Sequence, residues 1–203
     1  MKKTLIAATF CAFIFTACSE QKPATEGQET AQAEQASEDS EAETVVVETP
    51  DFTATGGPVK MQVEQLLTDY ITLKDALIES DAATAKTAAT TVLTAVNAIP
   101  VASLAGDEKQ YTEEKTQAIK DAATAISGSA DLGVQRTHLQ PLSEATYALT
   151  KAFGATDQKL YYQYCPMAFD DKGAYWISTE EQVLNPYFGD AMLKCGTNKE
   201  AYN

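Results

Sequence analysis

Apolar residues recur at intervals of three and four along four stretches between residues 58 and 153, which is the spacing of amphipathic helices. The predicted helices are Pro58 to Glu79, Ala82 to Asn97, Asp107 to Ile126 and Leu132 to Phe153. Turn and cap residues separate them, with Ser80-Asp81 before the second helix, a cap at Asp107 and another at Asp131. Because the connections are short, the pattern predicts an antiparallel four-helix bundle.

The pattern changes after Gly154, where aromatic residues crowd a segment that prolines and glycines interrupt. We expect irregular structure there, with a short strand or helix around Trp176 to Leu184, packed on the bundle. The predicted fold is therefore all-α: an antiparallel four-helix bundle carrying an irregular, aromatic-rich C-terminal segment. Pro141 removes one backbone donor from the fourth helix and predicts a kink near His138 to Gln140.

The first residues have the order of an export signal. Lys2 and Lys3 precede an apolar run from Leu5 to Phe15, which is shorter than the roughly 20 residues of a transmembrane helix. The run ends in Phe15-Thr16-Ala17-Cys18, which resembles a lipoprotein lipobox. The resemblance implies a signal peptide over residues 1–17 and a lipid on the Cys18 thiol, with Ser19 favouring the outer membrane. An uncleaved N-terminal anchor is the alternative.

Residues 18–57 are expected to form a disordered acidic tether. From Ser19 to Thr49 there are nine acidic residues against one base, Lys22, and no aromatic residue. Such a segment cannot bury enough apolar surface to offset the entropy that ordering would cost. Residues 58–203 then make one domain.

Composition argues against two classes of function. The formal net charge is −14, and binding of nucleic-acid phosphates requires a basic surface. The sequence has no glycine-rich phosphate loop, zinc-protease helix or Ser/His/Asp signature, so we do not expect an enzyme.

Candidate chemistry gathers in the last forty residues. Cys11 lies within the predicted signal peptide and Cys18 is the predicted lipidation site, which leaves Cys165 and Cys195 to the domain. The pair predicts either a disulfide or a thiolate metal site, and both interpretations stay open. Each cysteine has a methionine close by, in Cys165-Pro-Met167 and in Met192-Leu-Lys-Cys195.

Soft sulfur donors select soft ions, and copper(I) is the foremost of them. The only histidine, His138, adds an imidazole, so zinc is a second option, although methionine is a poor zinc ligand. The candidate ligands for copper(I), with silver or zinc as alternatives, are Cys165, Met167, Met192, Cys195 and His138. Core packing is the competing explanation for Met167 and Met192.

Several segments together resemble a family of envelope domains of unknown function. They are Tyr164-Cys-Pro-Met-Ala, Trp176-Ile-Ser, Asn185-Pro-Tyr-Phe-Gly-Asp-Ala-Met-Leu-Lys-Cys-Gly196, Tyr70 to Leu77 and Gln135 to Ser143. Domains of this family occur alone in lipoproteins and at the C-terminus of periplasmic adaptor subunits of copper and silver efflux pumps. The resemblance covers about residues 59–200 and implies metal handling, with the five sulfur and imidazole positions as recurrent residues. Leu139 departs from the aromatic residue expected after the histidine.

Two hypotheses follow. The first is a membrane-anchored envelope lipoprotein that binds copper(I) as a buffer or chaperone linked to heavy-metal efflux. The second is an interaction module, stapled by a Cys165–Cys195 disulfide, that docks on an efflux adaptor or another envelope protein. They differ in the oxidation state of the two thiols.

Overall fold

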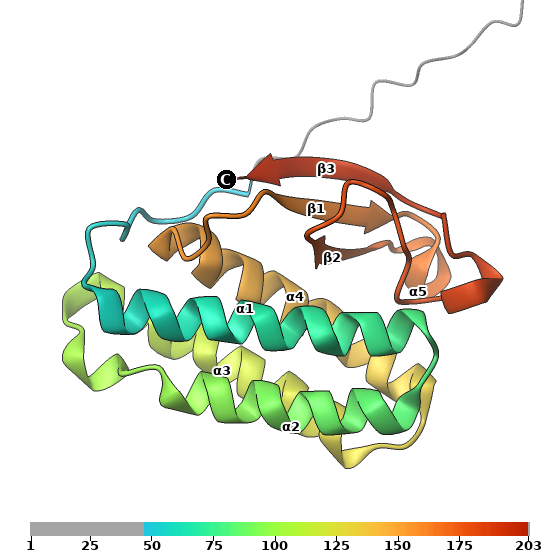
Figure 1. Ribbon diagram of the computed structural model, residues 1–203, viewed down its shortest axis with the longest axis horizontal. Coiled ribbons are helices and arrows are strands. Elements are labelled where there is room, and N and C mark those ends of the chain that lie inside the picture. The colour runs from blue at the N-terminus through green and yellow to red at the C-terminus, as the bar shows by residue number, and fades with distance from the viewer. Residues whose placement is uncertain (1–46, 203) are drawn as a thin grey trace, which may run out of the picture. The chain divides into compact units, whose positions relative to one another are not determined.

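The computed structural model describes residues 47–202, and four long helices form its larger layer (Figure 1). They are α1 (Gly57–Ile78), α2 (Ala82–Ala98), α3 (Gly106–Gly128) and α4 (Leu132–Phe153), with a short 3₁₀ turn η1 (Val101–Ser103) between α2 and α3. Consecutive helices pack side by side, and α1 also packs on α4, so the predicted bundle is confirmed. None of the helices in residues 47–202 has both the length and the apolar content needed to cross a membrane.

The helix ends follow the predicted caps except at α3. The Asp81 carboxylate accepts the backbone N–H groups of Ala83 and Thr84, and Asp131 accepts that of Val134. The prediction that Asp107 caps the third helix is wrong. Ala105 holds the cap position without a side-chain bond, and Asp107 lies in the first turn, where its charge still suits the helix dipole. Helix α4 continues through Pro141 as one helix from Leu132 to Phe153.

The C-terminal segment corrects the all-α prediction, because it contains a three-stranded antiparallel sheet. Its strands are β1 (Leu160–Cys165), β2 (Ala174–Ser178) and β3 (Thr197–Tyr202), and β1 lies in the centre. Two short turns, α5 (Ala168–Asp171) and η2 (Gly189–Ala191), lie in the connections. Strand β1 is buried on both faces, so it lacks the alternation of polar and apolar residues that identifies a half-exposed strand. The segment is therefore more ordered than the sequence predicted.

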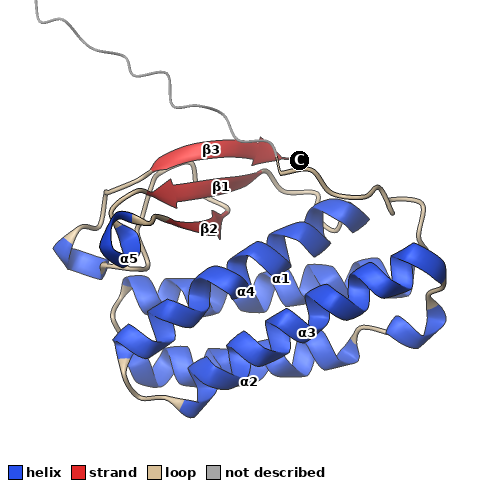
Figure 2. Cartoon of the chain, turned by 180° about the vertical axis from the view of Figure 1, so that it is seen from behind, coloured by secondary structure: helices blue, strands red, loops and turns tan. Residues whose placement is uncertain are grey.

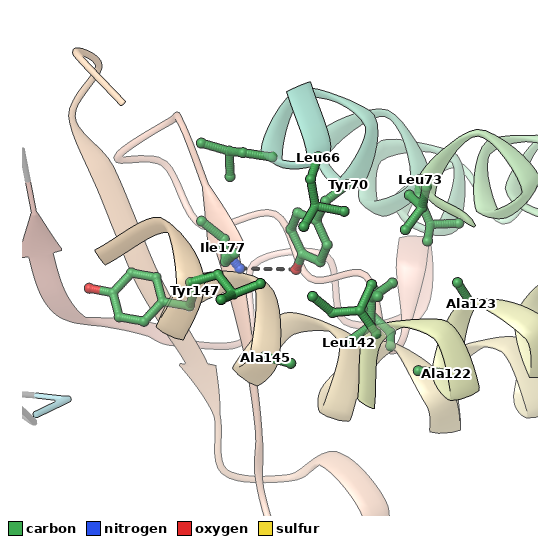
Figure 3. Packing of buried hydrophobic residues seen from close by; sticks show 14 of the residues in the cluster. Leu66, Tyr70, Leu73, Ala122, Ala123, Leu142, Ala145, Tyr147 and Ile177 are labelled. Carbon is green, nitrogen blue, oxygen red and sulfur yellow. Dashed lines mark hydrogen bonds between the residues drawn. The ribbon is translucent and has the colours of Figure 1, made fainter. Parts of the chain in front are cut away.

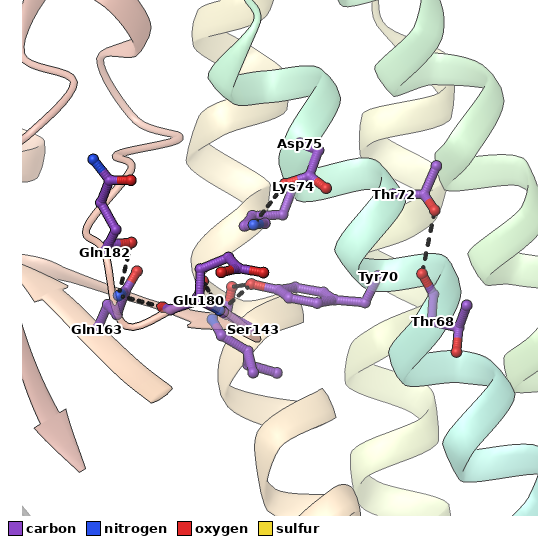
Figure 4. Close-up of polar contacts among 11 residues, drawn as sticks. Thr68, Tyr70, Thr72, Lys74, Asp75, Ser143, Gln163, Glu180 and Gln182 are labelled. Carbon is purple, nitrogen blue, oxygen red and sulfur yellow. Dashed lines mark hydrogen bonds and ion pairs between the residues drawn. The ribbon is translucent and has the colours of Figure 1, made fainter. Parts of the chain in front are cut away.

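The sheet covers α1 and α4, and a buried chain of hydrogen bonds joins the two layers (Figures 2 and 3). The backbone N–H of Ile177 in β2 donates to the Tyr70 hydroxyl of α1 at 3.1 Å. The Tyr70 and Ser143 hydroxyls are 2.7 Å apart, and Ser143 donates onward to the Leu139 carbonyl, so Tyr70 donates to Ser143 (Figure 4). One phenol therefore links β2, α1 and α4 within the hydrophobic core.

Residues 47–55 fall within the predicted disordered tether but lie against the folded domain. Phe52 packs its ring on Tyr111 and Phe153, and its N–H donates to the Ala152 carbonyl at 2.7 Å. Lys151 and Glu200 form an ion pair that holds both backbone groups of Val47. The predicted signal peptide, Cys18 and the predicted tether up to residue 46 lie outside the described residues.

Candidate metal centre

Cys165 is the last residue of the central strand, and its side chain is fully buried. Strand pairing determines its neighbours. Cys165 lies opposite Ala174 of β2, and the preceding residue, Tyr164, lies opposite Thr197 at the start of β3. The chain just before Thr197 is thereby brought to the end of β1, and that chain contains Cys195.

Cys195 lies in a turn between η2 and β3, and its sulfur is 3.1 Å from the sulfur of Cys165. Both cysteines are free thiols, and Cys195 is only partly buried. Its backbone N–H donates to the Met192 carbonyl at 3.0 Å, which closes the turn. The structure thus brings together two sulfurs that are thirty residues apart in the sequence.

A fully buried amide, Asn185, holds this turn in place. Its side-chain nitrogen donates to the Cys195 carbonyl at 2.8 Å, and its oxygen accepts the N–H of Tyr187 at 2.8 Å. Its backbone N–H donates to the Leu193 carbonyl at 2.8 Å. Asn185 was not predicted from the sequence, because an amide side chain that only supports a turn has no metal-ligand signature. Its position in the Asn-Pro-Tyr-Phe-Gly motif was the available signal.

Aromatic residues enclose the site on its inner side. A side chain at Gly196, whose φ is +145°, would meet the Tyr164 carbonyl oxygen at 2.8 Å and the Trp176 ring at 2.9 Å. The chain's one tryptophan therefore lies directly against the residue after Cys195. The Tyr187 ring packs edge-on against both Trp176 and Phe169. The site consequently has an apolar inner wall and an outer side where Cys195 is partly exposed.

The contact between the thiols perturbs the titration of Cys195. A hydrogen bond to the Cys165 sulfur raises the pKa of Cys195 to about 11, and burial and the charge of the Cys165 thiolate act in the same direction. The protonated form of Cys195 is favoured because only that form can donate a hydrogen bond to the Cys165 sulfur. Cys195 accordingly keeps its proton at neutral pH unless a cation replaces it.

The two methionines differ in accessibility. Met167 follows Cys165 by two residues and is 47% exposed, an unusual environment for a methionine that serves only as core filler. Met192 ends η2, is partly buried, and lies in the turn closed by its hydrogen bond to Cys195.

His138 is partly buried in α4, and no described contact joins it to the sulfurs. Arg136, two residues earlier, donates to the Pro186 carbonyl at 2.9 Å and so faces the C-terminal segment. Two residues correspond to about 200° around a helix, which turns His138 to the other side. Within residues 47–202, no group of three or more His, Cys, Asp or Glu side chains is placed to hold a metal ion. A role for His138 as a ligand stays a prediction.

Residues 66–158 match the model of a family described as a protein of unknown function, DUF3347. The match begins within α1 and ends just before β1, and it includes the stretches Tyr70 to Leu77 and Gln135 to Ser143. Over the four long helices, this match agrees with the expected resemblance to a domain of unknown function. Cys165 and Cys195 lie beyond the matched residues, and the links to lipoproteins and efflux adaptors stay predictions. Neither the curated proteins nor the solved structures contained a match to the chain.

Proposed function

We propose that this chain binds copper(I) through the thiolates of Cys165 and Cys195, as a metal buffer or chaperone of the cell envelope linked to heavy-metal efflux. The observation that carries the proposal is the 3.1 Å contact between the two sulfurs, one buried and one partly exposed. Two thiols in contact, one of them on a partly exposed residue, form a preassembled soft donor pair.

The donor set favours copper(I) over zinc. Structural zinc sites take four ligands, most often cysteine and histidine. In the described part of the chain no third His, Cys, Asp or Glu joins the two thiols. The groups next to them in the sequence are the thioethers of Met167 and Met192, which are soft donors suited to copper(I) and silver. A low-coordinate ion held by two thiolates and one thioether is the arrangement that we propose.

The sulfurs must separate slightly to receive an ion. With metal–sulfur bonds of about 2.3 Å, a tetrahedral or wider angle at the metal needs a sulfur–sulfur distance of about 3.7 Å or more. The 3.1 Å contact therefore has to open by roughly 0.6 Å. Cys165 is fixed in the central strand, so we assign the movement to the turn from Met192 to Cys195.

Binding must also displace the proton of Cys195, because thiolates are the metal-binding form. Since the pKa of Cys195 is raised to about 11, copper(I) competes with that proton throughout the neutral range. Apparent affinity should therefore increase as the pH rises toward that pKa.

The test is a copper(I) titration against a chromophoric chelator, using the reduced full chain with Cys11→Ser and Cys18→Ser so that two thiols remain. We expect one tightly bound ion per chain, lost in Cys165→Ser and in Cys195→Ser. One of the two variants Met167→Leu and Met192→Leu should weaken binding, and the one that does so identifies the thioether ligand. His138→Gln tests the imidazole. If the reduced protein carries two free thiols and does not compete with the chelator, the copper proposal is wrong.

The same contact favours a second candidate, an interaction module stapled by a Cys165–Cys195 disulfide that docks on an efflux adaptor or another envelope protein. This candidate requires oxidised sulfurs and no metal affinity after reduction. Counting free thiols in the protein as isolated, before the copper titration, separates the two functions.

Membrane attachment through a lipid on Cys18 belongs to the same proposal. We expect the mature chain to incorporate a radiolabelled fatty acid such as palmitate and to fractionate with the outer membrane. Cys18→Ala should abolish both, and labelling that persists in this variant would disprove lipidation at Cys18.

A further inference from the structure

The two sulfurs of the site differ in access. Cys165 has no exposed surface, whereas Cys195 lies in a partly exposed turn. Exchange between thiols and disulfides depends on which sulfur an external reagent can reach. Of the two cysteines, only Cys195 has any surface exposed to solution, so it is the one that an external molecule can approach.

The sulfur–sulfur distance of 3.1 Å is longer than a disulfide bond and shorter than the separation of two sulfurs that bind one metal ion. A disulfide bond is about 2.05 Å long, so the 3.1 Å contact must close by about 1 Å to form one. Metal binding requires the opposite movement, an opening of roughly 0.6 Å, as calculated above. A small movement of the turn from Met192 to Cys195 therefore leads to a disulfide in one direction and to a metal-bound pair of thiolates in the other. The two states exclude each other.

We propose that Cys165 and Cys195 are a redox couple that closes the metal site, and that Cys195 is the residue that exchanges with an external low-molecular-weight disulfide. In this assignment Cys165 is the resolving residue, because it is buried in contact with the sulfur that exchanges. The inference that oxidation prevents copper(I) binding rests on the proposed function. The exchange chemistry does not.

The reaction proceeds in two displacements. The Cys195 sulfur, on losing its proton, attacks one sulfur of the external disulfide, and the other leaves as a thiolate that takes up the proton. The Cys165 sulfur then attacks the Cys195 sulfur of the mixed disulfide, loses its own proton, and expels the second external thiol. The external disulfide is reduced to two thiols, and the protein dithiol is oxidised to one disulfide. With both thiolates consumed, the pair cannot hold copper(I).

Glutathione disulfide is the probe, and the experiment omits metal. The protein is the full chain with Cys11→Ser and Cys18→Ser, compared with the same chain carrying Cys165→Ser or Cys195→Ser. We expect mass spectrometry to find one glutathione on Cys195 in the Cys165→Ser variant. The Cys195→Ser variant should react at least tenfold more slowly. The parent chain should lose both thiols and retain no glutathione.

Two controls keep the result interpretable. In denaturant the two single variants should react at equal rates, which shows that the folded structure causes the difference. Cys165→Ala repeats the trapping experiment with a small apolar side chain, and circular dichroism and tryptophan fluorescence confirm that each variant is folded.

Equal adduct formation in the folded variants, or a parent chain that keeps glutathione on Cys195, would overturn the proposal. Copper(I) competition before oxidation, after oxidation and after re-reduction then tests the coupling. Exchange without copper binding retains the redox couple and rejects the proposed function. Copper binding without trapping of glutathione on Cys195 retains the proposed function and rejects the redox couple.

Discussion

At the scale of single residues, the thiol of Cys195 is notable for its raised pKa. Its pKa is raised to about 11 chiefly by its hydrogen bond with the Cys165 sulfur. Replacing Cys165 with alanine removes the acceptor, so the protonated form loses its advantage and the pKa of Cys195 should fall toward its ordinary value. A pH titration of thiolate ultraviolet absorbance measures this shift. A pKa that stays near 11 in the Cys165→Ala variant would assign the effect to burial.

A second residue-scale feature is the left-handed backbone just after the Cys-Pro-Met turn. Phe169, Asp170 and Asp171 have φ values of 54°, 57° and 62°, although none is glycine. A left-handed backbone costs an L-residue roughly 1–2 kcal/mol, and glycine avoids this strain. Glycine also gains entropy in the unfolded state, which offsets about 0.5–1 kcal/mol of the stabilisation. We expect Asp170→Gly to raise the free energy of unfolding by about 0.5–1 kcal/mol in urea denaturation. Lys172→Gly is the matched control, because φ is −79° there and the substitution should destabilise.

At the scale of elements, the Tyr70 hydroxyl joins α1 to both α4 and β2. It accepts from Ile177 N–H and donates to Ser143, and the phenol is fully buried. Tyr70→Phe keeps the ring but leaves a buried N–H without a partner, which costs about 1–3 kcal/mol. Chemical denaturation should show a loss of that size. The Tyr111→Phe variant, whose ring is only partly buried, should change stability by less than about 0.5 kcal/mol.

The elements also show how far the sequence could be interpreted. Helices α1 to α3 and the first half of α4 each bury one face, so their apolar residues repeat visibly, and Asp81 and Asp131 mark true helix beginnings. Strand β1 is buried on both faces and therefore shows no alternation. The two cysteines and their methionines could be named as candidate ligands from side-chain chemistry alone, and the structure adds that the two cysteine sulfurs are in contact. Asn185 was not, because its role depends on strand pairing that brings distant segments together.

At the scale of the whole molecule, the two cysteines connect the central strand to the last turn, and either a disulfide or a metal ion would fasten that connection. A disulfide would close a loop of about thirty residues, for which the chain-entropy model gives roughly 3–4 kcal/mol of stabilisation. Copper(I) at a free concentration one hundred times its dissociation constant would stabilise the reduced chain by about 2.7 kcal/mol. We therefore expect urea denaturation of the chain with Cys11→Ser and Cys18→Ser to show two stabilised states, oxidised and copper-loaded, above the reduced metal-free protein. The Cys195→Ser variant should show neither increment. Copper(I) should add nothing to the oxidised chain, because the disulfide consumes both thiolates; an equal increment there would place the ion at another site.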